Sequence, residues 1–171
     1  MSGIKKIFLS SVSKFLYYCF LLSKKSFNYQ LSNKYRKKYK VSNTFEFIGD
    51  GIVLEGEGEI ILGEFSHIAR NSWLSAFKNT KIEIGTHTRI ASNVTMITSN
   101  TKSKQDFSKT MERSEGNIMI GDHCWIGVNV YIKEGVTIGN NCIVGANAVV
   151  TKNIPDNSIV TGVNKIRKNF D

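Results

Sequence analysis

Three histidines are the side chains of this 171-residue chain best suited to acid–base chemistry, because an imidazole changes its charge near neutral pH. They are His67, His87 and His123. His87 and His123 each follow an isoleucine by three residues, Ile84 and Ile120, so both occupy one position of a repeating pattern. These two histidines are therefore candidates for a general base, whereas His67 has no evident partner.

Three cysteines, Cys19, Cys124 and Cys142, form no CxxC pair and match no zinc-site spacing. The sequence therefore predicts no metal site. Cys124 and Cys142 share one position of the repeat and are expected to be small core residues, with a nucleophilic role as the remote alternative.

An aliphatic residue recurs every six positions over the second half of the chain. The series runs Ile120, Ile126, Ile132, Ile138, Val144 and Val150. The residue four positions later is small in most hexads, and the same register occurs earlier at 84, 90 and 96. A period of six combines a short strand with a sharp corner, and three such hexads close one triangular coil. Stacked coils would bury a continuous aliphatic column.

These hexads resemble those of the hexapeptide-repeat acyltransferases, and most of all the bacterial acetyltransferases of sugars, capsule, lipopolysaccharide and exopolysaccharide. The motifs are Ile-Gly-Asp-His-Cys-Trp-Ile-Gly at 120–127, Glu-Gly-Val-Thr-Ile-Gly at 134–139 and Val-Gly-Ala-Asn-Ala-Val-Val-Thr-Lys at 144–152. The resemblance covers about residues 48–168. It implies an all-β fold, a left-handed parallel β-helix, with acetyl-CoA as acyl donor, no metal, and a homotrimer.

Residues 102–117 lack the hexad pattern, which resumes in register directly afterwards, and this predicts an excursion loop. In the resembled family such a loop helps to form the acceptor pocket between subunits. The residues expected to contact the acceptor are Asn100, Thr101, Lys102 and Arg113.

Acyl transfer to a hydroxyl requires a general base, and the family's usual histidine before the loop falls here on Thr101 or Lys102. Three explanations remain open. Lys102 could serve if its environment lowered its pKa by several units. His87 and His123 could serve, since with the loop removed from the count they would stack about 5 Å apart. Alternatively, the protein is a catalytically silent scaffold or binding module.

The resemblance also assigns residues to the donor. Small residues let the pantetheine approach the backbone and basic residues meet its phosphates. The matching positions are Gly145, Ala146, Thr151, Lys152 and Lys165. The family's Gly-Asn-Pro-Ala-Lys is altered to Gly-Val-Asn-Lys at 162–165.

The first 40 residues carry ten of the 23 basic residues and no acidic one, although the chain's net charge is only +9. Apolar residues between 4 and 20 follow a three-and-four spacing, which predicts a basic amphipathic helix. Such a helix binds anionic membrane surfaces peripherally, and its alternative is packing on protein. The longest apolar run, Phe15 to Leu22, is too short for a transmembrane helix, and no secretory signal is expected.

The sequence thus predicts a helical segment at 1–40 and a β-helix domain at 41–171. The expected function is acetyl-CoA-dependent O-acetylation of a sugar hydroxyl in a surface-polysaccharide precursor, which could be a lipid-linked glycan. The expected place is the cytoplasm, at the inner face of the bacterial cytoplasmic membrane through residues 1–24. Nucleic-acid binding is disfavoured, because the aromatic residues follow helical spacing rather than forming a stacking platform.

Overall fold

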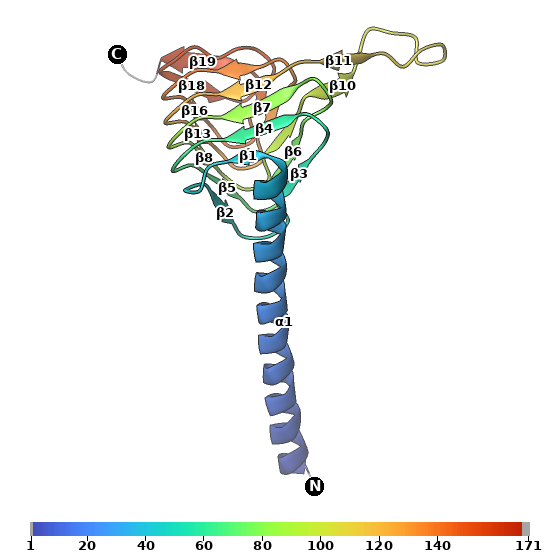
Figure 1. Ribbon diagram of the computed structural model, residues 1–171, viewed down its shortest axis with the longest axis vertical. Helices are drawn as coiled ribbons and strands as arrows, with labels where there is room; N and C mark the ends of the chain where they lie inside the picture. Colours follow the sequence, from blue (N-terminus) through green and yellow to red (C-terminus); the bar gives the residue numbers. More distant parts are fainter. Residues whose placement is uncertain (1, 169–171) are drawn as a thin grey trace. The chain divides into compact units, whose positions relative to one another are not determined.

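The computed structural model describes residues 2–168, and side chains from residue 12 onward. The chain divides into two units, Met1–Tyr35 and Arg36–Asp171. The predicted boundary at residue 40 lies close to this division. One helix, α1 (Ser2–Lys38), makes up the first unit, and the second consists of short stacked strands (Figure 1).

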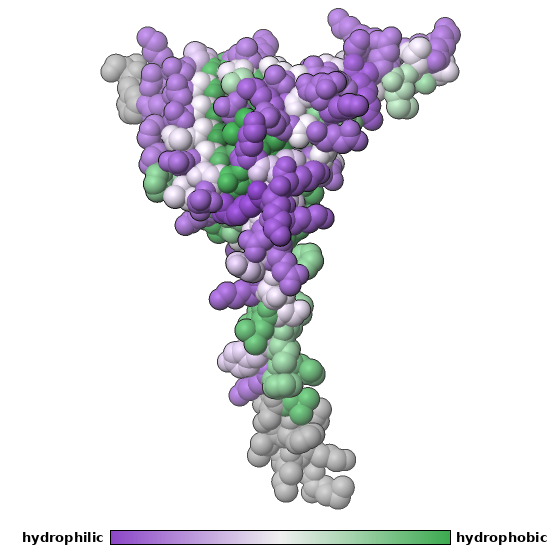
Figure 2. All heavy atoms as spheres, viewed as in Figure 1, coloured by the Kyte–Doolittle hydropathy of each residue, from purple (hydrophilic) through white to green (hydrophobic). Residues whose placement is uncertain are grey.

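Helix α1 has no proline, and basic residues in its last turn, Arg36 to Lys38, complement the helix dipole. The predicted helix is confirmed. The run from Phe15 to Leu22 exposes apolar and aromatic side chains in consecutive positions, and at 3.6 residues per turn these surround the helix. In this stretch the apolar surface is therefore a collar, and not the single stripe that the spacing predicts. Figure 2 shows the apolar side chains on the one face of the helix that is in view. Within the described residues, no helical segment is both long enough and apolar enough to cross a membrane.

The strands of the second unit form three sheets, here called A, B and C. Sheet A holds, in order, β1 (Lys40–Val41), β4 (Glu59–Leu62), β7 (Lys81–Ile84), β12 (Ile118–Ile120) and β15 (Thr137–Ile138). Sheet C holds β3 (Val53–Glu55), β6 (Trp73–Ser75), β9 (Thr95–Ile97), β14 (Tyr131–Ile132) and β17 (Val149–Val150). The strands in both sheets pair in parallel.

Sheet B completes each coil between A and C. It holds β2 (Glu46–Ile48), β5 (His67–Ala69), β8 (Arg89–Ile90), β13 (Trp125–Ile126), β16 (Ile143–Val144), β18 (Ser158–Thr161) and β19 (Lys165–Lys168). All of its pairings are parallel except the last, where β19 turns back antiparallel along β18. The chain thus winds through A, B and C in turn, which confirms a parallel β-helix of stacked coils.

The core is the predicted aliphatic column. In sheet B, Ile68, Ile90, Ile126, Val144 and Val160 lie in register on successive coils, and each is fully buried. At the coil corners, the backbones of successive coils come close together. Gly121 permits this approach, because a Cβ there would lie 2.8 Å from the backbone of Gly139 on the next coil.

The excursion interrupts the stack without shifting it. Ile84 and Ile120 pair across adjacent coils, although the loop separates them in sequence. The predicted loop at 102–117 is confirmed as an excursion, but it is not wholly irregular. Strands β10 (Ser99–Thr101) and β11 (Arg113–Glu115) pair antiparallel at its base and project from the coils as a hairpin (Figure 1).

Candidate active site

The two candidate histidines lie at the corner between sheets A and B. The ring centroids of His87 and His123 are 5.0 Å apart and the rings are stacked at 21°, which confirms the predicted geometry. Phe65, one coil earlier, continues the stack at 5.1 Å from His87. Both imidazoles are exposed, so they are accessible to a substrate or to another protein surface.

The backbone explains why these two histidines coincide. His87 and His123 have φ angles of 54° and 56°, in the left-handed region that asparagine, aspartate and histidine tolerate best among non-glycine residues. Asn141 and Asn157 hold the same conformation at this corner on later coils, and their side-chain amides hydrogen-bond at 2.7 Å. Histidine and asparagine suit this backbone, which Phe65 also adopts at a φ of 53°, and the stacking of the coils aligns the rings.

The loop leaves from a different corner, between sheets C and A. At its base, the Asn100 amide nitrogen donates to Glu134 Oε2 at 2.6 Å and to the Tyr131 hydroxyl oxygen at 3.1 Å. The Lys133 ammonium lies 3.2 Å from Glu134 Oε1. The Glu134 side chain is only 3% exposed, so this carboxylate is buried under the foot of the loop.

The electrostatics of this cluster fix its protonation. Burial acts to raise the pKa of Glu134, but the hydrogen bond from Asn100 and the nearby Lys133 outweigh it, and the net pKa is lowered. Burial and the negative charge of Glu134 raise the pKa of Tyr131. Glu134 is therefore a carboxylate and Tyr131 a neutral phenol at neutral pH.

A pocket of about 460 Å³ opens beside this cluster. Its walls combine an amide, hydroxyls, ammonium groups and the carboxylate, which are the groups that hydrogen-bond a hydroxylated ligand. The lining residues are Asn100, Thr101, Lys102, Ser103, Lys104, Ser114, Tyr131, Lys133 and Glu134. Three of the four residues that the sequence assigned to the acceptor loop therefore line one pocket.

Tyr131 and Glu134 were missed by the sequence reasoning. Glu134 occupies a turn position of the hexad, two residues after the aliphatic Ile132, and its equivalents Asn140 and Lys152 are exposed. It is buried because the loop folds over it. The sequence feature that could have identified Glu134 is its place directly before the glycine of the Glu-Gly-Val motif.

Arg113, which does not line the pocket, and Lys102, which does, both have structural partners. The Arg113 guanidinium lies 4.9 Å from the Phe77 ring centroid and donates to the Ser99 hydroxyl at 3.3 Å. Lys102 is exposed and pairs with Glu112 at 2.8 Å. A lysine base requires burial or neighbouring positive charge, and Lys102 lacks the burial.

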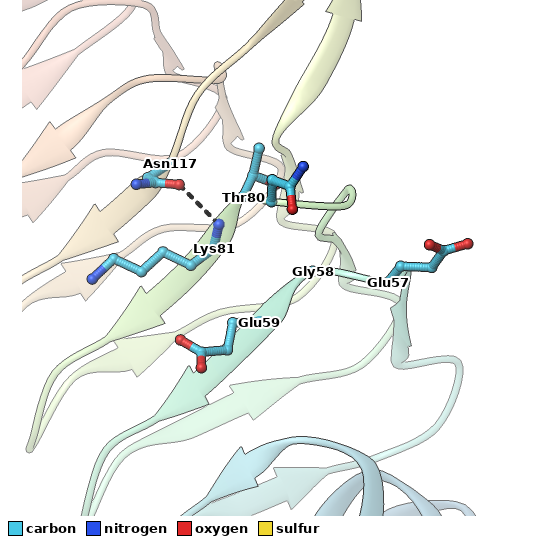
Figure 3. Close-up of a pocket in the computed structure, with 7 residues that line it drawn as sticks. Glu57, Gly58, Glu59, Thr80, Lys81 and Asn117 are labelled. Carbon is cyan, nitrogen blue, oxygen red and sulfur yellow. Dashed lines mark hydrogen bonds between the residues drawn. The ribbon is translucent and has the colours of Figure 1, made fainter.

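A second pocket, of about 420 Å³, lies on the other side of the loop's foot (Figure 3). Asn117, where the chain re-enters the coils, accepts a hydrogen bond from the Lys81 backbone nitrogen at 2.9 Å. The Thr80 and Thr98 hydroxyls are hydrogen-bonded at 2.6 Å. This bond links the residue before β7 to the residue before β10, at the foot of the loop. The lining residues are Glu57, Gly58, Glu59, Asn79, Thr80, Lys81 and Asn117.

The predicted donor residues lie on two corners of the coil. Gly145 and Ala146 form the turn between sheets B and C, and Thr151 and Lys152 follow β17 at the corner between C and A. Val150 is paired with Ile132, so this second turn lies one coil beyond Glu134. Thr151 and Lys152 therefore share the corner of the loop, whereas Gly145 and Ala146 do not.

The altered C-terminal motif is attached to the same turn. The Asn164 amide donates to the Thr151 hydroxyl at 2.6 Å and accepts from the Thr151 backbone nitrogen at 2.8 Å. Lys165 follows directly and begins the exposed strand β19. Asn164 thus anchors a basic strand, Lys165–Lys168, beside the last complete coil.

The inward cysteines are core residues, as predicted. Cys124 and Cys142 are buried, and their thiols contact the carbonyl oxygens of Gly139 and Pro155 on the next coil at 3.0 and 3.1 Å. Burial raises the pKa of Cys124 to about 11. Such a thiol is a poor nucleophile at neutral pH. Among the described residues, no three His, Cys, Asp or Glu side chains gather as a metal site would require.

Comparison with known proteins connects this geometry to a function. Residues 117–152 match the family model of the bacterial transferase hexapeptide, six repeats. A galactoside O-acetyltransferase of Escherichia coli is 32% identical over 142 residues, covering 80% of this chain and 70% of that protein.

Two solved structures are similar in fold and sequence. A hexapeptide-repeat acetyltransferase of Vibrio cholerae is 27% identical with a TM-score of 0.61, covering 80% of this chain and 77% of that one. The same protein has been solved in complex with acetyl-CoA. An N-acyltransferase of Bacillus cereus, solved with dTDP-4-amino-4,6-dideoxyglucose and coenzyme A, is 25% identical with a TM-score of 0.63, covering 77% and 76%.

Proposed function

The chain belongs to the hexapeptide-repeat acetyltransferases, and we propose that it transfers an acetyl group from acetyl-CoA to a sugar hydroxyl of a surface-polysaccharide precursor. The observation that carries the proposal is the pocket under the loop, which shares its corner with the turn of Thr151 and Lys152, one coil away. The pocket offers hydrogen-bonding groups to a sugar, and the turn occupies the donor motif of the family. The relative from E. coli is named as an O-acetyltransferase of galactosides.

The reaction moves one proton in two steps, first to a base and then to the leaving group. The acceptor oxygen attacks the thioester carbonyl, the C–O bond forms, and collapse of the tetrahedral intermediate breaks the C–S bond. The hydroxyl proton passes to a general base and then to the departing sulfur of coenzyme A. A hydrogen-bond donor must also stabilise the oxyanion of the intermediate.

His123, with His87 stacked on it, is the proposed base. Within one protomer this pair lies at the corner between sheets A and B, whereas the loop lies between C and A. One protomer therefore does not unite base and acceptor pocket. A homotrimer would do so if the histidine corner of one protomer faced the loop of its neighbour, and this requirement supports the proposed trimer.

The donor is assigned to the turn at Thr151 and Lys152 and to the adjoining basic strand that starts at Lys165. Basic side chains there would pair with the phosphates of acetyl-CoA. Gly145 and Ala146, on another corner, would contact the donor of a different active site of the trimer.

The acceptor is proposed to be presented at a membrane surface, which a lipid-linked glycan precursor would provide. The supporting features are the basic first 40 residues and the exposed apolar collar at 15–22 of α1 (Figure 2). Anionic lipid would attract the charge and cover the apolar side chains. The proposed location is therefore the cytoplasmic face of the membrane, on the side of the membrane where acetyl-CoA is made.

Calorimetric titration with acetyl-CoA tests the donor site without an acceptor. Saturable binding of one donor per chain is expected, and Lys152→Ala should weaken it about tenfold through loss of a phosphate contact. Lys40→Ala, in the first coil, is the matched control and should bind normally. Absence of binding by the wild type at millimolar acetyl-CoA would refute the proposed donor site.

Thiol release from acetyl-CoA then tests transfer with a panel of three acceptors: methyl β-galactoside, UDP-N-acetylgalactosamine and dTDP-4-amino-4,6-dideoxyglucose. An acetyl ester on one of the first two, identified by mass spectrometry, is the expected product. Acetylation of the amino sugar alone would make the protein an N-acetyltransferase. If no panel member were acetylated, the proposed activity on sugars would be wrong.

A further inference from the structure

The cluster at the loop's foot leaves the Tyr131 hydroxyl hydrogen available to a ligand. The Asn100 amide nitrogen donates to both Glu134 and Tyr131, at 2.6 and 3.1 Å. The Tyr131 oxygen is thus an acceptor in this cluster, and its own O–H hydrogen is not used there. Tyr131 is half-buried and lines the 460 Å³ pocket, so a ligand in that pocket can reach its hydroxyl.

Glu134 is unsuited to be the missing base. Its side chain is 3% exposed, one carboxylate oxygen accepts from Asn100, and the other faces Lys133. A base must reach the proton that it removes. A buried, fully partnered carboxylate is instead suited to hold its donor in one orientation, because a charge-assisted hydrogen bond is stronger than a neutral one.

The backbone around Glu134 keeps this arrangement in place. A Cβ on Gly116, in the returning limb of the loop, would lie 2.7 Å from the Cα of Gly135, so the limb rests directly on the Glu134–Gly135 turn. Asn100 belongs to the outgoing strand β10. Both limbs of the loop therefore meet at this glutamate.

Taking the proposed function as its premise, we infer that Tyr131 binds the acceptor sugar by donating a hydrogen bond to it, and that Glu134 is a positioning residue that acts on Tyr131 through Asn100. Tyr131 serves acceptor binding, and the histidine pair serves proton transfer. No assignment from the resemblance covers either residue, because both lie outside the loop in sequence.

Acceptor kinetics test this with the panel member that the wild type acetylates fastest. Tyr131→Phe removes only the hydroxyl, and we expect it to raise the acceptor KM about fivefold, leaving kcat and the acetyl-CoA KM unchanged, as loss of a neutral hydrogen bond does. Glu134→Gln keeps the size of the side chain and should raise the same KM to a smaller extent.

The double variant separates positioning from general damage. If Glu134 acts through Tyr131, adding Glu134→Gln to Tyr131→Phe should cost nothing further, because the hydroxyl that it positions is already gone. Tyr39→Phe, whose hydroxyl bonds the Gly56 carbonyl, and Glu83→Gln, whose carboxylate pairs with Lys81, are the matched controls and should leave the acceptor KM unchanged.

Three results would overturn the inference. They are an unchanged acceptor KM in Tyr131→Phe, a rise in the acetyl-CoA KM of the same size, or additive effects in the double variant. If the wild type acetylates no panel member, the proposed function itself fails and the inference falls with it. An active wild type with a normal Tyr131→Phe variant would leave the function standing and reject the role of Tyr131 alone.

Discussion

At the scale of single residues, the molecule divides its chemistry between two sets of side chains. His87 and His123 are exposed at a corner whose left-handed backbone favours asparagine and histidine. Tyr131 and Glu134 lie at another corner, one half-buried and the other buried. The first set can move a proton, and the second can bind and orient a hydroxylated ligand.

Replacing the histidines one at a time identifies the base. His123→Ala should lower kcat by at least a hundredfold if this imidazole removes the acceptor proton, with little change in the KM for acetyl-CoA. His87→Ala should have a smaller effect if His87 only supports the ring. Asn substitutions at the same sites control for the left-handed backbone. Full activity in both alanine variants would exclude this pair as the base.

The lowered pKa of Glu134 predicts how stability depends on pH. The pKa of Glu134 is near 4.5 in the unfolded chain and lower in the folded protein, so the unfolded chain takes up the proton at a higher pH. The stabilisation that the Glu134 carboxylate gives the folded protein is therefore complete above pH 4.5 and is lost as the pH falls through the folded pKa. Urea unfolding between pH 3 and 6 should therefore show a shallower loss of stability in Glu134→Gln than in wild type. An identical pH dependence of the two proteins would contradict the assigned electrostatics.

At the scale of elements, short strands are stable here because every internal coil is paired with the coil on each side of it. The strands are two to four residues long, yet Ile90, Ile126 and Val144 on successive coils are completely buried. This packing requires the backbones of successive coils to lie close together. Glycines at the corners allow that close spacing, whereas the loop projects out of the stack and is not subject to it.

Gly121→Ala tests the spacing between coils. The added Cβ would lie 2.8 Å from Gly139 and 2.5 Å from Asn140 Oδ1, so the coils must separate locally. We expect a loss of about 2 kcal/mol in the free energy of unfolding, measured by urea titration. Gly145→Ala is the control, since its backbone, like that of Gly121, is not left-handed and its added Cβ would lie no closer than 3.3 Å to a neighbouring atom. Equal stability of the two variants would mean that the coils accommodate the methyl group.

At the scale of the whole molecule, one protomer holds the parts of the proposed active site on separate corners. The acceptor pocket and the turn of Thr151 and Lys152 share one corner, but the histidines and Gly145 occupy the other two. Assembly is therefore the step that would complete the site. Membrane contact through the basic helical segment would then place it near its acceptor.

Light scattering of the purified protein should give three times the chain mass of 19.2 kDa. Coexpression of His123→Ala chains, which are expected to be inactive alone, with Asn100→Ala chains, whose acceptor KM is expected to be raised, should produce some sites with the wild-type acceptor KM, because some interfaces then combine an intact histidine with an intact loop. A monomeric protein with full activity, or a mixture in which every active site keeps the raised acceptor KM, would show that the site does not span two protomers.

Vesicle sedimentation tests the membrane proposal. The wild type should bind vesicles of phosphatidylcholine with phosphatidylglycerol, and bind pure phosphatidylcholine less, since charge and apolar burial act together. Replacing Phe15, Leu16 and Phe20 by serine should abolish binding. The control replaces the exposed Phe107 and Met111 of the loop by serine and should bind normally. Undiminished binding of the helix variant would refute this surface.

The sequence by itself determined the coil stack, the resumption of register at Ile120 and the stacking of His87 on His123. Each depends on a period of six, and a periodic pattern fixes which residues lie above one another without reference to the rest of the fold. Only the tertiary structure decided that Glu134 is buried, that Asn100 bonds it, and that the site residues fall on three corners. The loop has no period, so where its two limbs dock depends on contacts with residues more than 30 positions away in sequence.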